Sequence, residues 1–276
     1  MMSDHISLFR KTLDEWLADD GITNSAALAF HALVGIPSLL LFTLFVGSFF
    51  LKKQIIQASL VTDVSLFADD AAIKALNTLF TQLSVDNSFS FAFVISFFIY
   101  LWSAGNIFLQ LQKLINKMWG LTEQKGNWFD QFLRKRASAL VAAVVFGMLI
   151  IVSTMFEMVF FLISDNLNTA FSTPTLFVQF VSFGINFLTL VLLFVYIFRI
   201  LPEAKPEWKY VFTGALMTVS LLTLSKYLMG FYLSYSSISS VYGTIGSILA
   251  IFLWIYMSSM IVTFMVEFTG VYSKMQ

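Results

Sequence analysis

Six apolar stretches, each long enough to cross a lipid bilayer as a helix, dominate this 276-residue sequence. A spanning helix needs about 20 mostly apolar residues, because the hydrocarbon core is about 30 Å thick and each helical residue rises about 1.5 Å. The stretches lack the polar–apolar alternation of barrel strands, and open sheets cannot cross lipid. The sequence therefore predicts an all-α polytopic membrane protein with one membrane domain, 1–276, and six transmembrane helices. These spans cover approximately residues 30–51, 89–111, 137–163, 176–201, 210–233 and 242–268.

The composition supports this fold class. The chain is 58% hydrophobic and 12% charged, whereas about 25% of the residues in a soluble domain are charged. A disordered chain needs low hydrophobicity and high charge, so disorder is excluded. The net charge is zero and cysteine is absent, which argues against a polyanionic partner and a thiolate metal site. We therefore expect no cofactor, no metal and no nucleic acid, and we expect membrane lipids as partners.

The distribution of Lys and Arg predicts the orientation, because cytoplasmic loops are enriched in positive charge. Of the 16 Lys and Arg residues, 12 lie before span one, between spans two and three, around the end of span four, or after span six. The loops on the opposite side of the membrane carry three Lys residues. This bias places both termini in the cytoplasm and favours an even number of spans.

Two segments outside the spans predict amphipathic helices. Residues 6–20 place apolar side chains on one helical face, which indicates a helix on the cytoplasmic membrane surface or one packed against the cytoplasmic end of the bundle. That face consists of Phe9, Leu13, Trp16 and Leu17. The outward loop 52–88 has helical spacing at Ile73, Leu76, Phe80 and Leu83.

Four ionisable residues lie within the spans, where each costs about 2.5–3.5 kcal/mol on insertion scales unless it faces protein or water. Depth along the helices predicts two ion pairs, Glu157–Lys226 in the outer half and Arg199–Glu267 near the cytoplasmic ends. For the second pair, the alternative is that both side chains mark the interface and reach the headgroups. For the first, the charges either line a cavity or join helices together.

Span two ends in a polar stripe formed by Asn106, Gln110, Lys113 and Lys117, which share one helical face. The stripe lines a vestibule open to the cytoplasm, or it supplies hydrogen bonds between helices. The sequence leaves both interpretations open.

Span one contains a histidine and a proline. His31 titrates near neutral pH in an ordinary environment, although a single His at an interface commonly serves as a hydrogen-bonding residue. Pro37 removes one backbone hydrogen bond and favours a kink. In span three, Ala139, Ala143 and Gly147 recur every four residues and indicate close helix packing.

Several segments, taken in order, resemble one family. They read AALAFHALVGIPSLLLF at 26–42, LWSAGNIFLQLQKLINKMWG at 101–120, FLRKRASAL at 132–140, ILPEAKPEWKYVFTGAL at 200–216 and SSVYGTIGSILAIFLWIYMSSMIVTFMVEF at 239–268. The chain is similar to the YihY/BrkB family of bacterial inner-membrane proteins, once labelled ribonuclease BN. The family position at His31 is usually Tyr-like, and the usual Gly-Ala-Glu ending is represented here by Met265-Val266-Glu267. The resemblance implies a six-helix protein of the bacterial inner membrane. Of the family's Gly-Ala-Glu ending, only the acid, Glu267, is present here.

The resemblance implies transport or an envelope role, without a defined substrate. Metal-dependent RNA hydrolysis needs converging carboxylates or histidines, whereas the clustered acids here lie in the outward loop, so we expect no ribonuclease and no other enzyme. We hypothesise a transporter of a small solute or lipid; the alternative is a non-transporting envelope scaffold that binds partners through the basic loop 112–136 or the outward cap. Homo-oligomerisation stays open. The transport-pathway candidates are Glu157, Lys226, Asn106, Gln110, Arg199, Glu267, His31 and Pro37.

Overall fold

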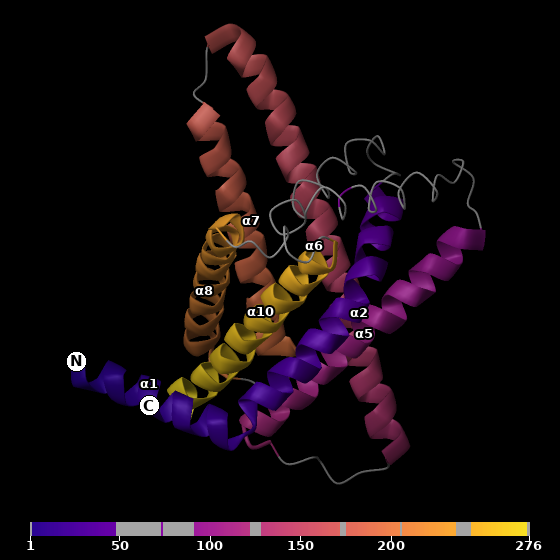
Figure 1. Cartoon of the computed structure of the whole chain (residues 1–276). Helices are drawn as coiled ribbons and strands as arrows, with labels where there is room; N and C mark the ends of the chain where they lie inside the picture. Colours follow the sequence, from indigo (N-terminus) through magenta and orange to yellow (C-terminus); the bar gives the residue numbers. More distant parts are fainter. Residues whose placement is uncertain are drawn as a thin grey trace.

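The computed structural model describes residues 2–47, 73, 91–121, 128–171, 175–204, 206–235 and 244–274. All the regular secondary structure in these ranges is helical, which confirms the all-α prediction (Figure 1). The elements are α1 (Met2–Ala18), α2 (Gly21–Gly47), α5 (Phe91–Met118), α6 (Trp128–Phe171), α7 (Thr175–Ile200), α8 (Trp208–Tyr235) and α10 (Thr244–Lys274).

Four of the described helices contain stretches long and apolar enough to cross a membrane. These stretches match the last four predicted spans, and they are Arg134–Ser153, Phe180–Ile200, Trp208–Tyr232 and Leu249–Lys274. The first two predicted spans, 30–51 and 89–111, overlap α2 and α5 but extend beyond the described residues. The total of six spans therefore stays a prediction. The predicted outward-loop helix also lies outside the described residues, apart from Ile73, which is helical.

The helices pack in a closed series of neighbours. Helix α2 packs against α5, α5 against α6, α6 against α7, α7 against α8, α8 against α10, and α10 back against α2. Short α1 lies across one end of this bundle, against α10 and α2 (Figure 1). We call this end the α1 end. The starts of α2 and α8 and the ends of α5, α7 and α10 lie toward this end.

The core lies along the inward faces of the helices. Tyr100 is fully buried on α5, and its hydroxyl donates to the Ala143 carbonyl of α6 at 2.7 Å. Ala139 and Ala143 are fully buried, so the small-residue face of α6 serves close helix packing, as its spacing predicts. The outward faces expose large apolar side chains such as Phe180 and Phe231, as is typical of helices that face acyl chains.

The end of α5 is capped by a glycine. Gly120 has a φ of +66°, in the left-handed region that glycine adopts without strain. Its amide donates to the Lys117 carbonyl at 3.0 Å, and the Leu121 amide donates to the Asn116 carbonyl at 2.9 Å. This pair of bonds is a Schellman cap, which turns the chain away after Trp119 and fixes that indole at the α1 end.

Candidate functional site

Glu267 is the most deeply buried acid among the described residues. It lies in the last third of α10 and exposes 1% of its surface. Neither of its carboxylate oxygens accepts a hydrogen bond from an amide, a hydroxyl or a basic side chain in the described part of the chain. An unpaired charge in such a place is costly, because burial removes the water that solvates it. This carboxyl group is therefore the strongest candidate for a functional role.

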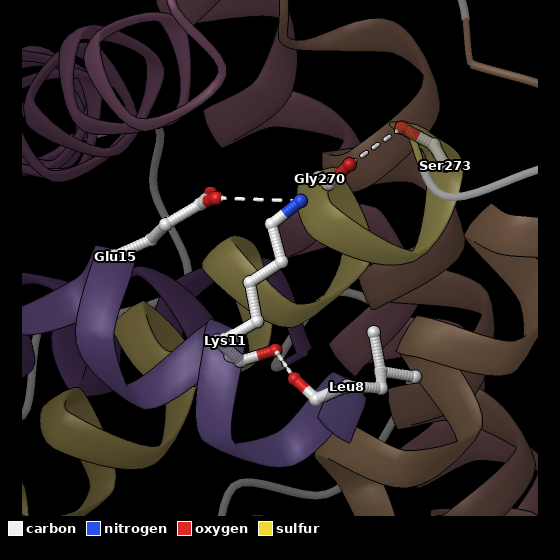
Figure 2. A network of polar contacts seen from close by, with 6 residues as sticks. Leu8, Lys11, Glu15, Gly270 and Ser273 are labelled. Atoms are coloured by element: carbon white, nitrogen blue, oxygen red, sulfur yellow. Dashed lines mark hydrogen bonds and ion pairs between the residues drawn. The ribbon is translucent and has the colours of Figure 1, made fainter. Parts of the chain in front are cut away.

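The charged groups that act on Glu267 come mainly from α1. Glu15 and Asp19 carry the same charge as Glu267 and face it, while Lys274 contributes a positive charge from the end of α10. Glu15 is itself paired with Lys11 across one turn of α1, with Nζ and Oε1 3.8 Å apart (Figure 2). The Glu15 carboxyl group also lies close enough to Glu267 for a side-chain hydrogen bond. Two carboxyl groups form such a bond only when one of them carries a proton.

A hydroxyl cluster holds α1 and α2 against α10 one turn before Glu267. Trp16 of α1 donates its Nε1 hydrogen to Thr263 Oγ1 at 3.1 Å. Ser25 of α2 lies 2.7 Å from the same oxygen. Both hydroxyl residues are buried, so these bonds are well shielded and fix α1 relative to the carboxyl group.

A second indole contacts α10 on the other side of Glu267. Trp119 Nε1 donates to the Val266 carbonyl at 2.9 Å. The ring lies against Gly270, where an added Cβ would be 2.6 Å from Trp119 Cδ1. Glycine at this position therefore allows the close approach of the indole to α10.

The corner between α1 and α2 is also fixed. Asp20 has a φ of +57°, and the Asn24 side chain donates to the Asp19 carbonyl at 2.8 Å. Lys117 of α5 donates to that same carbonyl at 2.9 Å and lies 3.8 Å from an Asp20 carboxylate oxygen. The acidic corner is thus tied to the polar end of α5.

The predicted ion pair between Arg199 and Glu267 is wrong. Arg199 Nη1 donates to the Pro206 carbonyl, and its guanidinium group lies 5.0 Å from the centre of the Trp208 ring. No basic side chain lies at hydrogen-bond distance from Glu267 within the described residues. The two residues share a depth, but α7 packs on α6 and α8 whereas α10 packs on α8 and α2. Helix α8 therefore stands between them. The alternative, that both reach the headgroups, also fails for the buried Glu267.

The polar stripe of α5 takes part in contacts between helices. Arg136 of α6 donates from Nη1 to Asn106 Oδ1 at 2.6 Å, and its guanidinium group stacks 4.3 Å from the centre of the Trp102 ring. Gln110 is half-buried. At Asn106 the structure favours hydrogen bonding between helices over the lining of a vestibule.

The remaining predicted residues lie on α2, α6 and α8. Lys226 is half-buried on α8, and the side chain of Glu157 on α6 lies outside the described residues. Helix α7 packs against both of these helices, and their pairing stays a prediction. His31 is half-buried, with its ring centre 5.9 Å from that of Phe30. Pro37 lies within α2, and its side chain is outside the described residues.

Several polar contacts at the α1 end were missed by the sequence reasoning. Gln112 is buried and donates from Nε2 to the Leu201 carbonyl at 2.8 Å, which joins the ends of α5 and α7. Thr263 and Ser25 form the hydroxyl cluster described above. Nothing in their local sequence distinguishes them from ordinary polar residues in apolar helices. Within the described residues, no group of three or more acids and histidines has the geometry of a metal site.

The closed bundle of apolar helices, four of which contain stretches long and apolar enough to cross a membrane, defines an integral α-helical membrane protein. The family model described as virulence factor BrkB matches residues 12–276. The chain therefore belongs to the BrkB family, as the resemblance of its motifs predicts.

Curated relatives match over shorter segments. A UPF0761 membrane protein of Aeromonas salmonicida is 31% identical over 104 residues, which cover 33% of this chain and 36% of the relative. A UPF0761 membrane protein of Tolumonas auensis is 26% identical over 81 residues, which cover 29% of this chain and 27% of the relative. The match thus spans about a third of these relatives' length. No solved structure matches the chain.

Proposed function

We propose that this protein is a transporter that moves a small solute or lipid across the bacterial inner membrane, with the α1 end in the cytoplasm. The proposal depends on Glu267. Ionisable residues inside membrane proteins are rare, and they mark substrate pathways and proton relays when they are not paired structurally. Glu267 is almost completely buried, and among the described residues no basic side chain lies at hydrogen-bond distance from it.

The occupant that Glu267 fits best is a proton. The like charges of Glu15 and Asp19 favour a positive species beside this carboxyl group. Calcium and magnesium need several oxygen ligands in a defined geometry, and the described acids do not form such a group. A single carboxyl group can hold a proton without further ligands. We therefore propose proton-coupled transport, with Glu267 as the proton-carrying group.

A second candidate is a non-transporting envelope scaffold. The observation that favours it is the use of Asn106 in a hydrogen bond between α5 and α6, and of Gln112 in one between α5 and the end of α7. A bundle in which such polar groups serve only to join helices has no polar pathway. If the protein is a scaffold, Glu267 has no function and its burial lowers the stability of the fold.

Reconstitution into liposomes tests the two candidates. The probes are a pH-sensitive dye inside the vesicles and a fluorescent phospholipid whose exchange between leaflets is followed by chemical quenching. The variants are Glu267→Gln and the matched control Glu203→Gln, because Glu203 is an exposed acid after α7. Gel filtration and circular dichroism confirm that each variant is folded.

We expect the wild type and Glu203→Gln to move protons or lipid faster than protein-free vesicles, and Glu267→Gln to lose most of this activity. Equal activity in Glu267→Gln and the wild type would refute the role of Glu267. If wild-type vesicles match empty vesicles with both probes, the scaffold is favoured instead.

A further inference from the structure

Helix α1 has three distinct faces, although its sequence predicts two. The first is a buried face that repeats every four residues and is formed by Leu8, Thr12 and Trp16. It packs on α10, where Leu8 joins a cluster with Met265, Phe268 and Val271. These contacts account for the packing of α1 on the bundle.

The second face is apolar and uncovered. It also repeats every four residues, with Phe9, Leu13 and Leu17 exposed by 58%, 37% and 50%. Because a helix turns about 100° per residue, this face lies directly beside the buried face. The predicted apolar face is therefore divided: Trp16 is buried against α10, whereas Phe9, Leu13 and Leu17 keep a third or more of their surface exposed.

The third face is charged and completes the circumference. Arg10, Lys11 and Asp14 are exposed and follow the apolar face around the helix. Around the circumference of α1, the face that packs on protein is thus followed by the exposed apolar face and then by the charged face. This order is typical of a helix at the boundary between lipid and water, with one side held by protein.

The position of α1 along α10 indicates which medium the apolar face meets. The segment of α10 that contacts α1 belongs to the apolar stretch Leu249–Lys274, which is long enough to cross the membrane. Phe9 packs on Phe264 of this stretch, with ring centres 5.5 Å apart. We therefore expect a face beside that segment to lie near the level of the acyl chains.

The uncovered apolar surface continues along the chain. After the fixed corner, α2 exposes Ile22, Phe30 and Val34, which follow one another at intervals of eight and four residues. Helix α2 covers most of the first predicted span, so its outward face is expected to contact lipid. The apolar face of α1 precedes it without an intervening polar segment other than the corner itself.

We propose that the apolar face of α1, formed by Phe9, Leu13 and Leu17, is inserted among the acyl chains of the leaflet at the α1 end. The charged face then lies in the headgroups and the adjacent water. The occupant of this surface is the host membrane's own lipid, because the surface borders a transmembrane stretch and continues into a lipid-facing helix. A second copy of the chain or another protein would exclude both lipid and water from it.

Site-directed spin labelling tests this proposal directly. The chain contains no cysteine, so each introduced cysteine carries the only label. The variants are Leu13→Cys and Leu17→Cys on the apolar face, and Arg10→Cys and Asp14→Cys on the charged face. Each labelled full-length protein is reconstituted in phospholipid vesicles. Collision rates are measured with oxygen, which concentrates in lipid, and with a water-soluble nickel complex.

We expect oxygen to relax the labels at positions 13 and 17 severalfold more effectively than the nickel complex, with the reverse at positions 10 and 14. Equal access of nickel to all four positions would place α1 in water and overturn the proposal. Low access of both reagents at positions 13 and 17 would mean that protein covers the face, which also overturns it. These outcomes do not depend on transport activity.

Discussion

The packing of Trp119 against Gly270 makes Gly270→Ala a sharp test of the α1 end. An added Cβ would lie 2.6 Å from Trp119 Cδ1 and 2.8 Å from its Nε1, which is closer than carbon atoms pack. The indole must therefore move. Because Trp119 is 8% exposed and Nε1 donates to the Val266 carbonyl at 2.9 Å, the movement breaks a bond that water cannot easily replace.

The size of the effect follows from three contributions to the free energy of unfolding. Overpacking a well-filled site costs about 1–3 kcal/mol, and loss of a hydrogen bond costs about 0.5–1.5 kcal/mol. Alanine in place of glycine inside a helix raises the free energy of unfolding by about 0.5–1 kcal/mol. Together these central values predict that Gly270→Ala lowers the free energy of unfolding by about 2 kcal/mol.

The assay is equilibrium unfolding in mixed detergent micelles, followed by circular dichroism. The matched control is Gly184→Ala in α7, where an added Cβ would have no neighbour within 4 Å. We expect this control to be unchanged or slightly more stable. In a Trp119→Ala background, the cost of Gly270→Ala should largely disappear. Equal stability of the two alanine variants would refute the close approach of Trp119.

Three further substitutions test other contacts. Trp16→Phe removes the donor to Thr263, so the amides of α1 should exchange severalfold faster in hydrogen-exchange mass spectrometry; unchanged exchange would count against this anchor. Tyr100→Phe removes the bond to the Ala143 carbonyl, and the free energy of unfolding should fall by about 0.5–1.5 kcal/mol; no loss in an unfolding titration would contradict that bond. Gly120→Ala places a side chain on a backbone in the left-handed conformation, with no neighbour within 4 Å of the added Cβ. We expect this variant to lose about 1–2 kcal/mol of the free energy of unfolding. We expect Gly120→Asn to lose less.

Much of the fold can be predicted from the sequence, because a chain in lipid must satisfy its backbone hydrogen bonds within each helix. The predicted span 176–201 corresponds to α7, Thr175–Ile200. The prediction is poorer for α6, which begins at Trp128, before the predicted span. Lys and Arg are good helix formers, so the basic segment continues the helix that hydropathy alone would start later.

The site is only partly predictable for a geometric reason. Position along a span gives the depth of a residue, but it does not give the rotation of the helix or the identity of its neighbours. Glu267 is identified from sequence because an acid in an apolar helix is unusual. Helix packing between segments far apart in the chain decides which residues are neighbours. It places Arg199 beyond α8, and it makes Glu15 and Asp19 face Glu267 instead. No local pattern carries that information.

The length of α6 has a consequence for the shape of the protein outside the bilayer. Its 44 residues extend about 66 Å, more than twice the thickness of the hydrocarbon core. Even a tilt of about 40°, the upper end of the usual range, leaves it spanning about 50 Å along the membrane normal. Part of α6 must therefore extend beyond the hydrocarbon core. A fluorophore attached to the helical turns outside the core would report their height above the headgroups.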